Sequence, residues 1–154
     1  MLELVQPDSV SLWDVARRLV DEYAASLQID LSFQNFAQEV RHLETEYGPP
    51  HGHFLLARRD GTFVGCGGLR RFSERTCEMK RLYVESAHRS RGIGEAIARA
   101  LIAEARRLGY DTILLDTLPS MRSAHQLYLA LGFTKTPPYR HNPIAGTTYL
   151  KLQV

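Results

Sequence analysis

The chain has 154 residues, 44% of them hydrophobic, and its 19 Lys and Arg residues against 17 Asp and Glu residues give a net charge of +2. A chain of this length buries about two thirds of its unfolded surface, so a single domain over residues 1–154 needs no disulfide or metal to stabilise its core. The small net charge argues against nucleic acid as a partner, because a phosphate-binding surface leaves a clear excess of basic residues. We therefore interpret Arg70–Arg71 and Arg106–Arg107 as solvated surface.

No apolar run approaches the roughly 18 residues that cross a bilayer, so we expect no membrane partner. Cys66 and Cys77 lie in apolar runs and are expected to be small buried hydrophobic residues. The histidines and cysteines lack zinc-like spacing, so no metal site is predicted, and His125 and His141 are expected at the surface. Without a signal-peptide pattern, the expected location is cytoplasmic.

The first third of the chain is predicted to be mostly helical. Residues 2–6 form a short strand, and residues 12–23 form a helix with one apolar face. Ser11 and Asp14 fit a capping box at the start of that helix. A second amphipathic pattern, which begins at Phe33, predicts a helix over residues 33–47.

The middle of the chain predicts a hairpin and a third strand. Asp60–Gly61 is a tight-turn pair between strands over residues 54–57 and 62–69, and the third strand covers residues 77–84. Three glycines weaken the second strand locally, which indicates a bulge or the close approach of another backbone. They are Gly65, Gly67 and Gly68.

The remaining sequence predicts a strand–helix–strand unit followed by a further helix. Apolar residues at helical spacing place a long helix over residues 92–108, with Gly109 as its C-cap. Thr112–Leu115 is predicted to be buried on both faces and parallel to the strand before the long helix. The further helix carries an apolar stripe of Ala124, Leu127, Tyr128 and Leu131, and a last strand covers residues 147–152.

The connection into the long helix is the segment that indicates chemistry. Unpaired backbone N–H groups and the positive end of the helix dipole gather at such a helix N-terminus. Gly92 and Gly94 would let phosphates approach those groups, and Arg89 and Arg91 add charged donors. A diphosphate is therefore the expected ligand, and the plainer alternative is a tight turn with solvated arginines.

Two other phosphate-binding folds fit this segment poorly. A dinucleotide-binding fingerprint requires glycine at position 97, where this chain has Ile97, although Asp116 could supply its acidic residue. The antiparallel hairpin upstream also disfavours that fold. A P-loop is excluded because no Gly-Lys-Ser/Thr follows the glycines.

The same segment resembles the signature of the GNAT superfamily of N-acetyltransferases, Arg/Gln-x-x-Gly-x-Gly/Ala after an apolar strand. Here it reads Arg89-Ser90-Arg91-Gly92-Ile93-Gly94. Residues 78–84 are similar to the family's fourth strand and residues 124–133 to its Leu-Tyr-x-x-Leu-Gly-Phe segment. The resemblance implies an α/β fold with a mixed, mostly antiparallel central sheet, a parallel β-α-β acyl-CoA-binding unit and flanking helices.

The resemblance also implies acetyl-CoA as co-substrate. Its diphosphate would lie on backbone N–H groups before and within the long helix, and its pantetheine arm would lie along the third strand where the two central parallel strands separate. The implied cofactor-binding residues are Leu82, Tyr83, Val84, Arg89, Ser90, Arg91, Gly92, Ile93, Gly94 and Glu95. Many relatives have asparagine where this chain has Met121, which puts one cofactor contact in question.

The implied reaction is direct attack of an amine on the thioester. Glu78 is the candidate base, acting through a water, and the alternative is an exposed strand carboxylate paired with Arg70 or Arg71. Tyr128 matches the tyrosine that often protonates the CoA sulfur in this family, and the alternative is a core-packing role.

The expected partner is an amine acceptor: a small molecule, an amino acid or a peptide terminus. Arg70, Arg71 and Arg140 would suit a carboxylate on that acceptor, although surface salt bridges explain them equally well. A catalytically silent acyl-CoA-binding regulatory module is the rival function. Homodimers are common among proteins with this fold.

Overall fold

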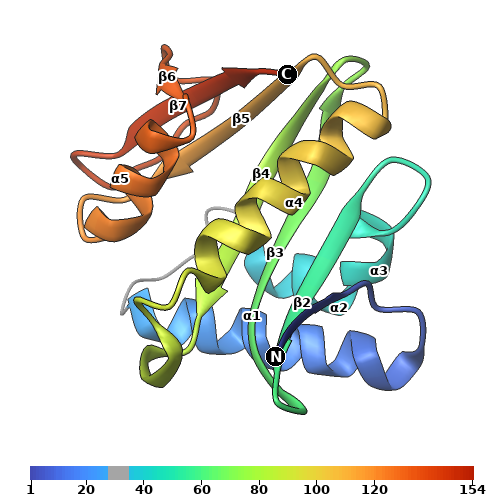
Figure 1. Cartoon of the computed structure of the whole chain (residues 1–154). Helices are drawn as coiled ribbons and strands as arrows, with labels where there is room; N and C mark the ends of the chain where they lie inside the picture. Colours follow the sequence, from blue (N-terminus) through green and yellow to red (C-terminus); the bar gives the residue numbers. More distant parts are fainter. Residues whose placement is uncertain (28–34) are drawn as a thin grey trace.

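The computed structural model describes residues 1–27 and 35–154, and a seven-stranded sheet runs through it (Figure 1). The strand order is β1-β2-β3-β4-β5-β7-β6, and every neighbouring pair is antiparallel except β4 and β5. This confirms the expected mixed sheet. The strands are β1 Leu2–Val5, β2 His53–Arg59, β3 Thr62–Ser73, β4 Thr76–Val84, β5 Thr112–Thr117, β6 Thr134–Lys135 and β7 Thr148–Gln153.

Helices cover both faces of the sheet and divide its core into two clusters (Figure 1). On one face, α4 and α5 pack over a core that includes Ile97, Leu101 and Tyr128. On the other face, α1 and α3 pack over a second core that includes Leu19 and Tyr47. The helices are α1 Val10–Leu27, α2 Phe36–Arg41, α3 Leu43–Tyr47, α4 Ile93–Arg107 and α5 Arg122–Ala130.

The N-terminal helices differ in detail from the sequence prediction. The hydroxyl of Ser9, and not that of Ser11, caps α1 by accepting a hydrogen bond from the Leu12 N–H at 3.2 Å, so the predicted capping box was wrong. The predicted second helix is divided into α2 and α3 at His42, whose φ of −120° and ψ of 36° lie outside the helical region. Phe33, the first residue of that pattern, lies outside the described residues.

The three glycines of β3 have the roles that the sequence indicated. The pairing of β3 with β4 shifts register between Cys66 and Gly68, and Arg81 on β4 takes a left-handed φ of 63° at this bulge. A Cβ on Gly68 would lie 2.6 Å from the Tyr47 ring, and one on Gly65 would lie 2.7 Å from the Tyr83 carbonyl oxygen. Glycine at these positions lets rings and backbone pack directly against β3.

The α4–β5 connection confirms the predicted unit with two corrections. The C-cap of α4 is Leu108, and Gly109 follows it with a φ of +92°. The Tyr110 N–H donates to the Ala105 carbonyl at 3.1 Å, which completes a Schellman motif. The strand β5 is parallel to β4 as predicted, but Leu114 is only half-buried, so β5 is not buried on both faces.

Both cysteines are free and buried, as expected for small hydrophobic residues. No helix in the described ranges is long and apolar enough to span a membrane.

Candidate functional site

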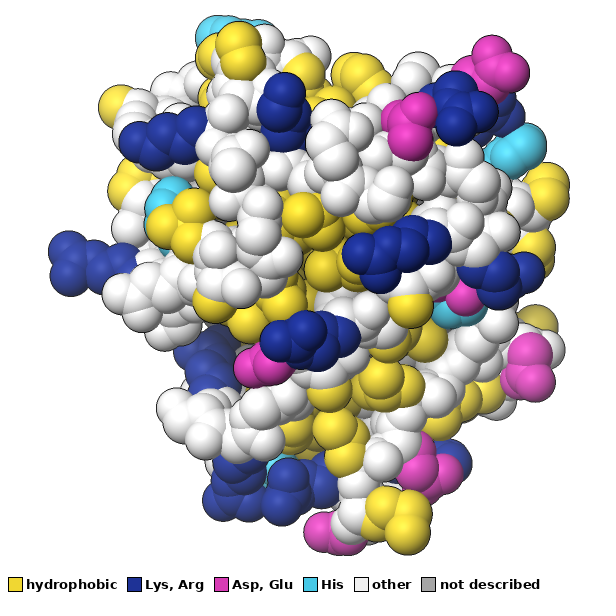
Figure 2. Space-filling model, turned by 45° about the horizontal axis from the view of Figure 1, so that its top comes forward, with side chains coloured by type: hydrophobic (Ala, Val, Ile, Leu, Met, Phe, Trp, Pro, Cys, Tyr) yellow, Lys and Arg dark blue, Asp and Glu magenta, His cyan; other side chains and the backbone are white. Residues whose placement is uncertain are grey.

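A groove of about 580 Å³ lies where the C-terminal end of β4 meets the N-terminal end of α4. This volume falls within the roughly 300–1,000 Å³ usual for small-molecule and cofactor sites. Figure 2 shows hydrophobic side chains in a hollow near the middle of one face of the molecule, with Lys and Arg side chains beside it. The groove is lined by Tyr23, Ser26, Leu27, Leu82, Tyr83, Val84, His88, Arg89, Ser90, Gly92, Ile93, Gly94, Glu95, Ser120, Met121, Arg122, Ser123, Ala124 and Leu127.

The sheet opens beside this groove because the parallel ladder is short. The strands β4 and β5 pair at three positions only, and the last pair is Glu78 with Leu114. Beyond that pair, β4 continues against β3 and β5 continues against β7. The edge of β4 that faces β5 is therefore unpaired at Leu82–Val84, and an extended ligand with amide groups can pair with that backbone.

The N-terminus of α4 offers donors for an anion. Its N-cap is Gly92, with a φ of 78° that suits glycine, and no side chain caps the first turn. The free N–H groups of that turn and the helix dipole favour negative charge. Arg89 is held beside them, because its Nε donates to the Val84 carbonyl at 2.8 Å and its guanidinium lies 5.9 Å from the centroid of the Tyr83 ring.

Nine of the ten predicted cofactor-binding residues line the groove, and the exception is Arg91, which is exposed and outside the lining. Sequence reasoning missed Tyr23 and its neighbours on α1. It also missed the serines at positions 120 and 123 around Met121. No local motif marks these residues, because α1 and the start of α5 reach the groove only through the tertiary fold.

Tyr128 lies next to the groove without lining it. It is 5% exposed and packs in the core, with its ring centroid 5.6 Å from that of Phe133. No hydrogen bond joins its hydroxyl to any residue within the described ranges. Burial, with smaller effects from Tyr23 and Asp116, raises the pKa of the Tyr128 hydroxyl. The phenol therefore holds its proton. Leu127, the residue before Tyr128 on α5, does line the groove.

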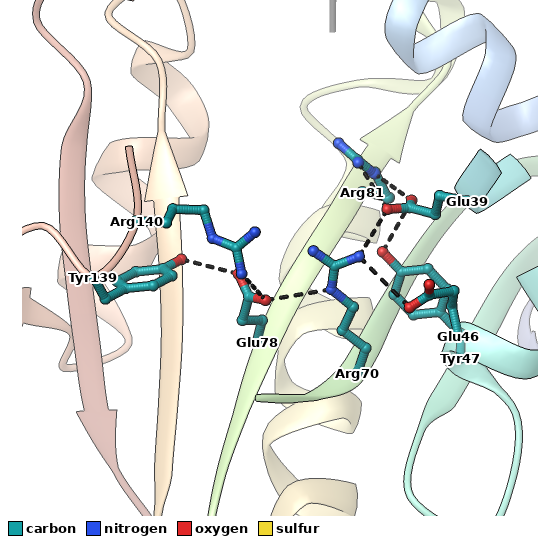
Figure 3. A network of polar contacts seen from close by, with 8 residues as sticks. All are labelled: Glu39, Glu46, Tyr47, Arg70, Glu78, Arg81, Tyr139 and Arg140. Atoms are coloured by element: carbon teal, nitrogen blue, oxygen red, sulfur yellow. Dashed lines mark hydrogen bonds and ion pairs between the residues drawn. The ribbon is translucent and has the colours of Figure 1, made fainter. Parts of the chain in front are cut away.

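Glu78 lies on the face of β4 opposite α4, within a network of buried charges (Figure 3). Its carboxylate accepts hydrogen bonds from Arg70 Nε at 3.3 Å, Arg140 Nη2 at 2.5 Å and the Tyr139 hydroxyl at 3.2 Å. Figure 3 shows Arg70 and Arg140 approaching it from opposite sides. Glu78 is 1% exposed, so it pairs with Arg70 as the plainer alternative expected, but it is not an exposed carboxylate.

The network continues from Arg70 to Glu39 on α2. The Glu39 carboxylate accepts from Arg81 Nε at 2.7 Å, from Arg70 Nη1 at 3.0 Å and from the Tyr47 hydroxyl at 3.1 Å. Burial alone would raise the pKa of Glu39, but the hydrogen bonds and charges of Arg81 and Arg70 outweigh it, so this pKa is lowered. The interpretation of Arg70 as solvated surface was therefore wrong, whereas Arg71 is exposed and contacts His51.

Within residues 1–27 and 35–154, no group of three or more His, Cys, Asp or Glu side chains is arranged to hold a metal ion. His141 is exposed, as expected, whereas His125 is half-buried on α5.

Comparisons with known proteins show similarity in sequence and in fold. Residues 14–133 match the sequence model of the Acetyltransferase (GNAT) family. A protein of Schizosaccharomyces pombe, named as an uncharacterized N-acetyltransferase, is 40% identical over 143 residues, which cover 92% of this chain and 88% of that protein. The N-acetylaspartate synthetase of Rattus norvegicus is 34% identical over 101 residues, which cover 65% of this chain and 34% of that protein.

A solved structure agrees with the fold. The crystal structure of a GNAT family acetyltransferase from Elizabethkingia anophelis with acetyl-CoA bound superposes with a TM-score of 0.64 at 19% sequence identity. The alignment covers 99% of this chain and 98% of that one.

The substitution Glu39→Gln tests the buried network. It should lower the free energy of unfolding at pH 7 by roughly 3–5 kcal/mol, because it leaves the buried Arg81 without its anion and removes one of the anions that pair with Arg70. Since the folded pKa of Glu39 is below its ordinary value of 4.5, its contribution is present above that pH and is lost as pH falls through the folded pKa. The difference between wild type and variant, measured by denaturant unfolding, should therefore shrink as the pH falls below 4.5.

Glu46→Gln is the matched control, because Glu46 lies 3.7 Å from Arg70 but its side chain is 42% exposed. It should change the free energy of unfolding by less than about 1 kcal/mol. Equal losses in the two variants would show that burial of the Glu39 ion pairs is not what stabilises this region.

Proposed function

This chain belongs to the GNAT acetyltransferase family, and we propose that it transfers the acetyl group of acetyl-CoA to a primary amine by direct attack. The observation that carries this proposal is the groove beside the short β4–β5 ladder. It combines an unpaired strand edge, which suits a pantetheine arm, with an open helix N-terminus, which suits a diphosphate. The acetyl-CoA bound to the structurally similar protein of Elizabethkingia anophelis supports the same ligand here.

The reaction sets two requirements on the chain's own residues. The amine must lose a proton before or as its nitrogen bonds to the acetyl carbon, and the thiolate released from that carbon must gain one. We assign the first role to Glu78, acting through a water, because it lies at the point where β4 and β5 separate. We assign the second to Tyr128, because it stands at the tyrosine of the Leu-Tyr-x-x-Leu-Gly-Phe segment and adjoins the groove at Leu127.

The acceptor class is supported by the relatives' names and by the charges near Glu78. A relative named N-acetylaspartate synthetase makes, by that name, an N-acetylated amino acid. Thiol release from acetyl-CoA in the presence of amino acids, peptides and simple amines tests the activity. A protein that binds acetyl-CoA and releases no thiol with any amine would instead be a silent acyl-CoA-binding module.

Arg89→Ala and Arg91→Ala form a matched pair that tests the diphosphate site. Arg89 lines the groove and Arg91 does not, although both are exposed in the same loop. Calorimetric titration should show that Arg89→Ala weakens acetyl-CoA binding by roughly ten- to a hundredfold, the value of one charged hydrogen-bonding partner. The loss should be much smaller for a pantetheine thioester without the diphosphate, and Arg91→Ala should bind both ligands normally. Equal effects of the two substitutions would contradict this placement.

Tyr128→Phe removes only the hydroxyl from the buried ring. If that hydroxyl protonates the departing thiolate, kcat should fall by roughly ten- to a thousandfold while acetyl-CoA affinity is unchanged. Tyr110→Phe is the control, because its hydroxyl donates to the His51 carbonyl at 2.7 Å, away from the groove. A loss of stability without a loss of kcat would instead support the core-packing role of Tyr128.

Glu78→Gln tests the base through its pH dependence. An alkyl amine with a pKa near 10 is almost fully protonated at neutral pH, so assistance by a base matters most at low pH. The loss of kcat/KM should therefore be largest near pH 6 and should decrease toward pH 9. A change in the amount of folded enzyme would lower every point equally, so a uniform loss would assign Glu78 a structural role.

A further inference from the structure

Arg140 carries more hydrogen-bond donors than the surrounding protein uses. Among the described residues, the Glu78 carboxylate is the one acceptor for its guanidinium. The Arg140 Nε is one of three buried side-chain polar atoms without a partner in the described part of the chain. The other two belong to Thr117, which carries no charge, and to His88, which can be neutral. A guanidinium cannot lose its proton in a protein, so its unused donors favour an anionic partner.

The Arg140 guanidinium is also held in place. Its central carbon lies 5.5 Å from the centroid of the Tyr139 ring and 5.9 Å from that of the Phe72 ring. The Tyr149 hydroxyl donates to the Arg140 backbone carbonyl at 3.2 Å, which fixes the residue on its loop. Its side chain remains 28% exposed, so part of it is accessible from solvent although its Nε is buried. A group that is oriented before binding loses little entropy when a ligand arrives.

Charges of both signs are packed around Glu78. Arg70, Lys80, Arg81 and Arg140 carry the positive charges, and Glu39, Glu46, Glu78 and Asp116 carry the negative ones. Burial, and then the positive charges of Arg81 and Arg70, lower the pKa of Lys80 to about 8, although Glu78 and Asp116 act in the opposite direction. Burial therefore disfavours further positive charge on this face of β4.

We propose that Arg140 binds a carboxylate of the acceptor, so that the amine substrates are amino acids or other amines that carry a carboxylate close to the amino group. The inference rests on the proposed acyl transfer. Because Arg140 and Glu78 are joined by one hydrogen bond, a carboxylate on the exposed side of Arg140 places the neighbouring amine beside Glu78. Glu78 in turn lies at the last β4–β5 pair, where the strands begin to separate, and the pantetheine arm of acetyl-CoA is proposed to lie along β4 beyond that pair.

The test compares each common amino acid with its own carboxamide as acceptor, at a saturating concentration of acetyl-CoA. The carboxamide keeps the side chain and the amine but removes the negative charge. The amine of the carboxamide is also less basic than that of the amino acid, so a larger fraction of it is neutral at pH 7.5. Intrinsic reactivity alone would therefore make the carboxamide the better acceptor. We expect the wild-type enzyme to use the best amino acid at least tenfold better, in kcat/KM, than its carboxamide.

Arg140→Ala should bring that ratio close to one, through a higher KM for the amino acid, and leave the KM for acetyl-CoA unchanged. Arg140→Lys keeps the positive charge but lacks the planar guanidinium group that can bind a carboxylate through two hydrogen bonds, so it should give an intermediate ratio of the two kcat/KM values. Arg71→Ala, an exposed arginine on the same strand as Arg70, should keep the wild-type ratio. Because both acceptors meet the same folded fraction and the same Glu78, the ratio does not respond to a merely structural effect of Arg140.

Two outcomes separate this inference from the proposed function. Acetylation of amines with equal kcat/KM for carboxamides and amino acids, or a wild-type ratio in Arg140→Ala, contradicts the assignment of a carboxylate site to Arg140. Either result leaves the proposed acyl transfer intact. If no amine is acetylated, calorimetric titration of amino acids into the protein saturated with CoA tests whether Arg140 binds a carboxylate. Binding that Arg140→Ala abolishes supports the site without the activity, and absence of binding overturns it.

Discussion

The early end of the β4–β5 ladder is the constraint on which both functional regions depend. Three parallel pairs join the two halves of the sheet, and the strands then continue against different partners, β3 and β7. The sheet stays continuous while its centre opens. The opening exposes the Leu82–Val84 backbone to the groove at α4, and Glu78 forms the last pair before the opening, with its side chain on the other face of the sheet. A fully paired ladder would leave no room between the strands for a thioester.

The bulge at Arg81 explains why so much charge gathers on one face of β4. Consecutive residues of a regular strand point to opposite faces, so Lys80 and Arg81 would be separated. The left-handed φ of Arg81 interrupts that alternation, and both side chains are buried among Glu39, Arg70 and Glu78. Such a backbone costs about 1–2 kcal/mol, and buried charges are costly unless paired. The ion pairs of Glu39 and Glu78 offset these costs and fix the positions of the arginines.

Local patterns predicted most of the fold and about half of the site. The glycine-rich connection at Gly92 and the apolar spacing of α4 are contained within short windows, so the residues at the α4 end of the groove were predictable, with Arg91 the exception. Predictions that depended on distant neighbours were less successful. Arg70 was interpreted as surface because no residue near it in sequence indicates its ion pair with Glu39, although pairing with Glu78 was one alternative. Leu114 was interpreted as fully buried because a short apolar run does not show which helices cover the strand.

The sequence by itself determined the order of the elements, the turn chemistry and the family, because periodicity and motifs are properties of neighbouring residues. Only the tertiary structure decided which side chains share a site. Tyr23 comes to the groove from α1 and Arg140 comes to Glu78 from the loop before β7, across 62 residues of chain. No local pattern encodes such contacts. They follow from how the sheet opens and how the loops pack against it, and this is why the surroundings of Glu78 emerge only from the folded molecule.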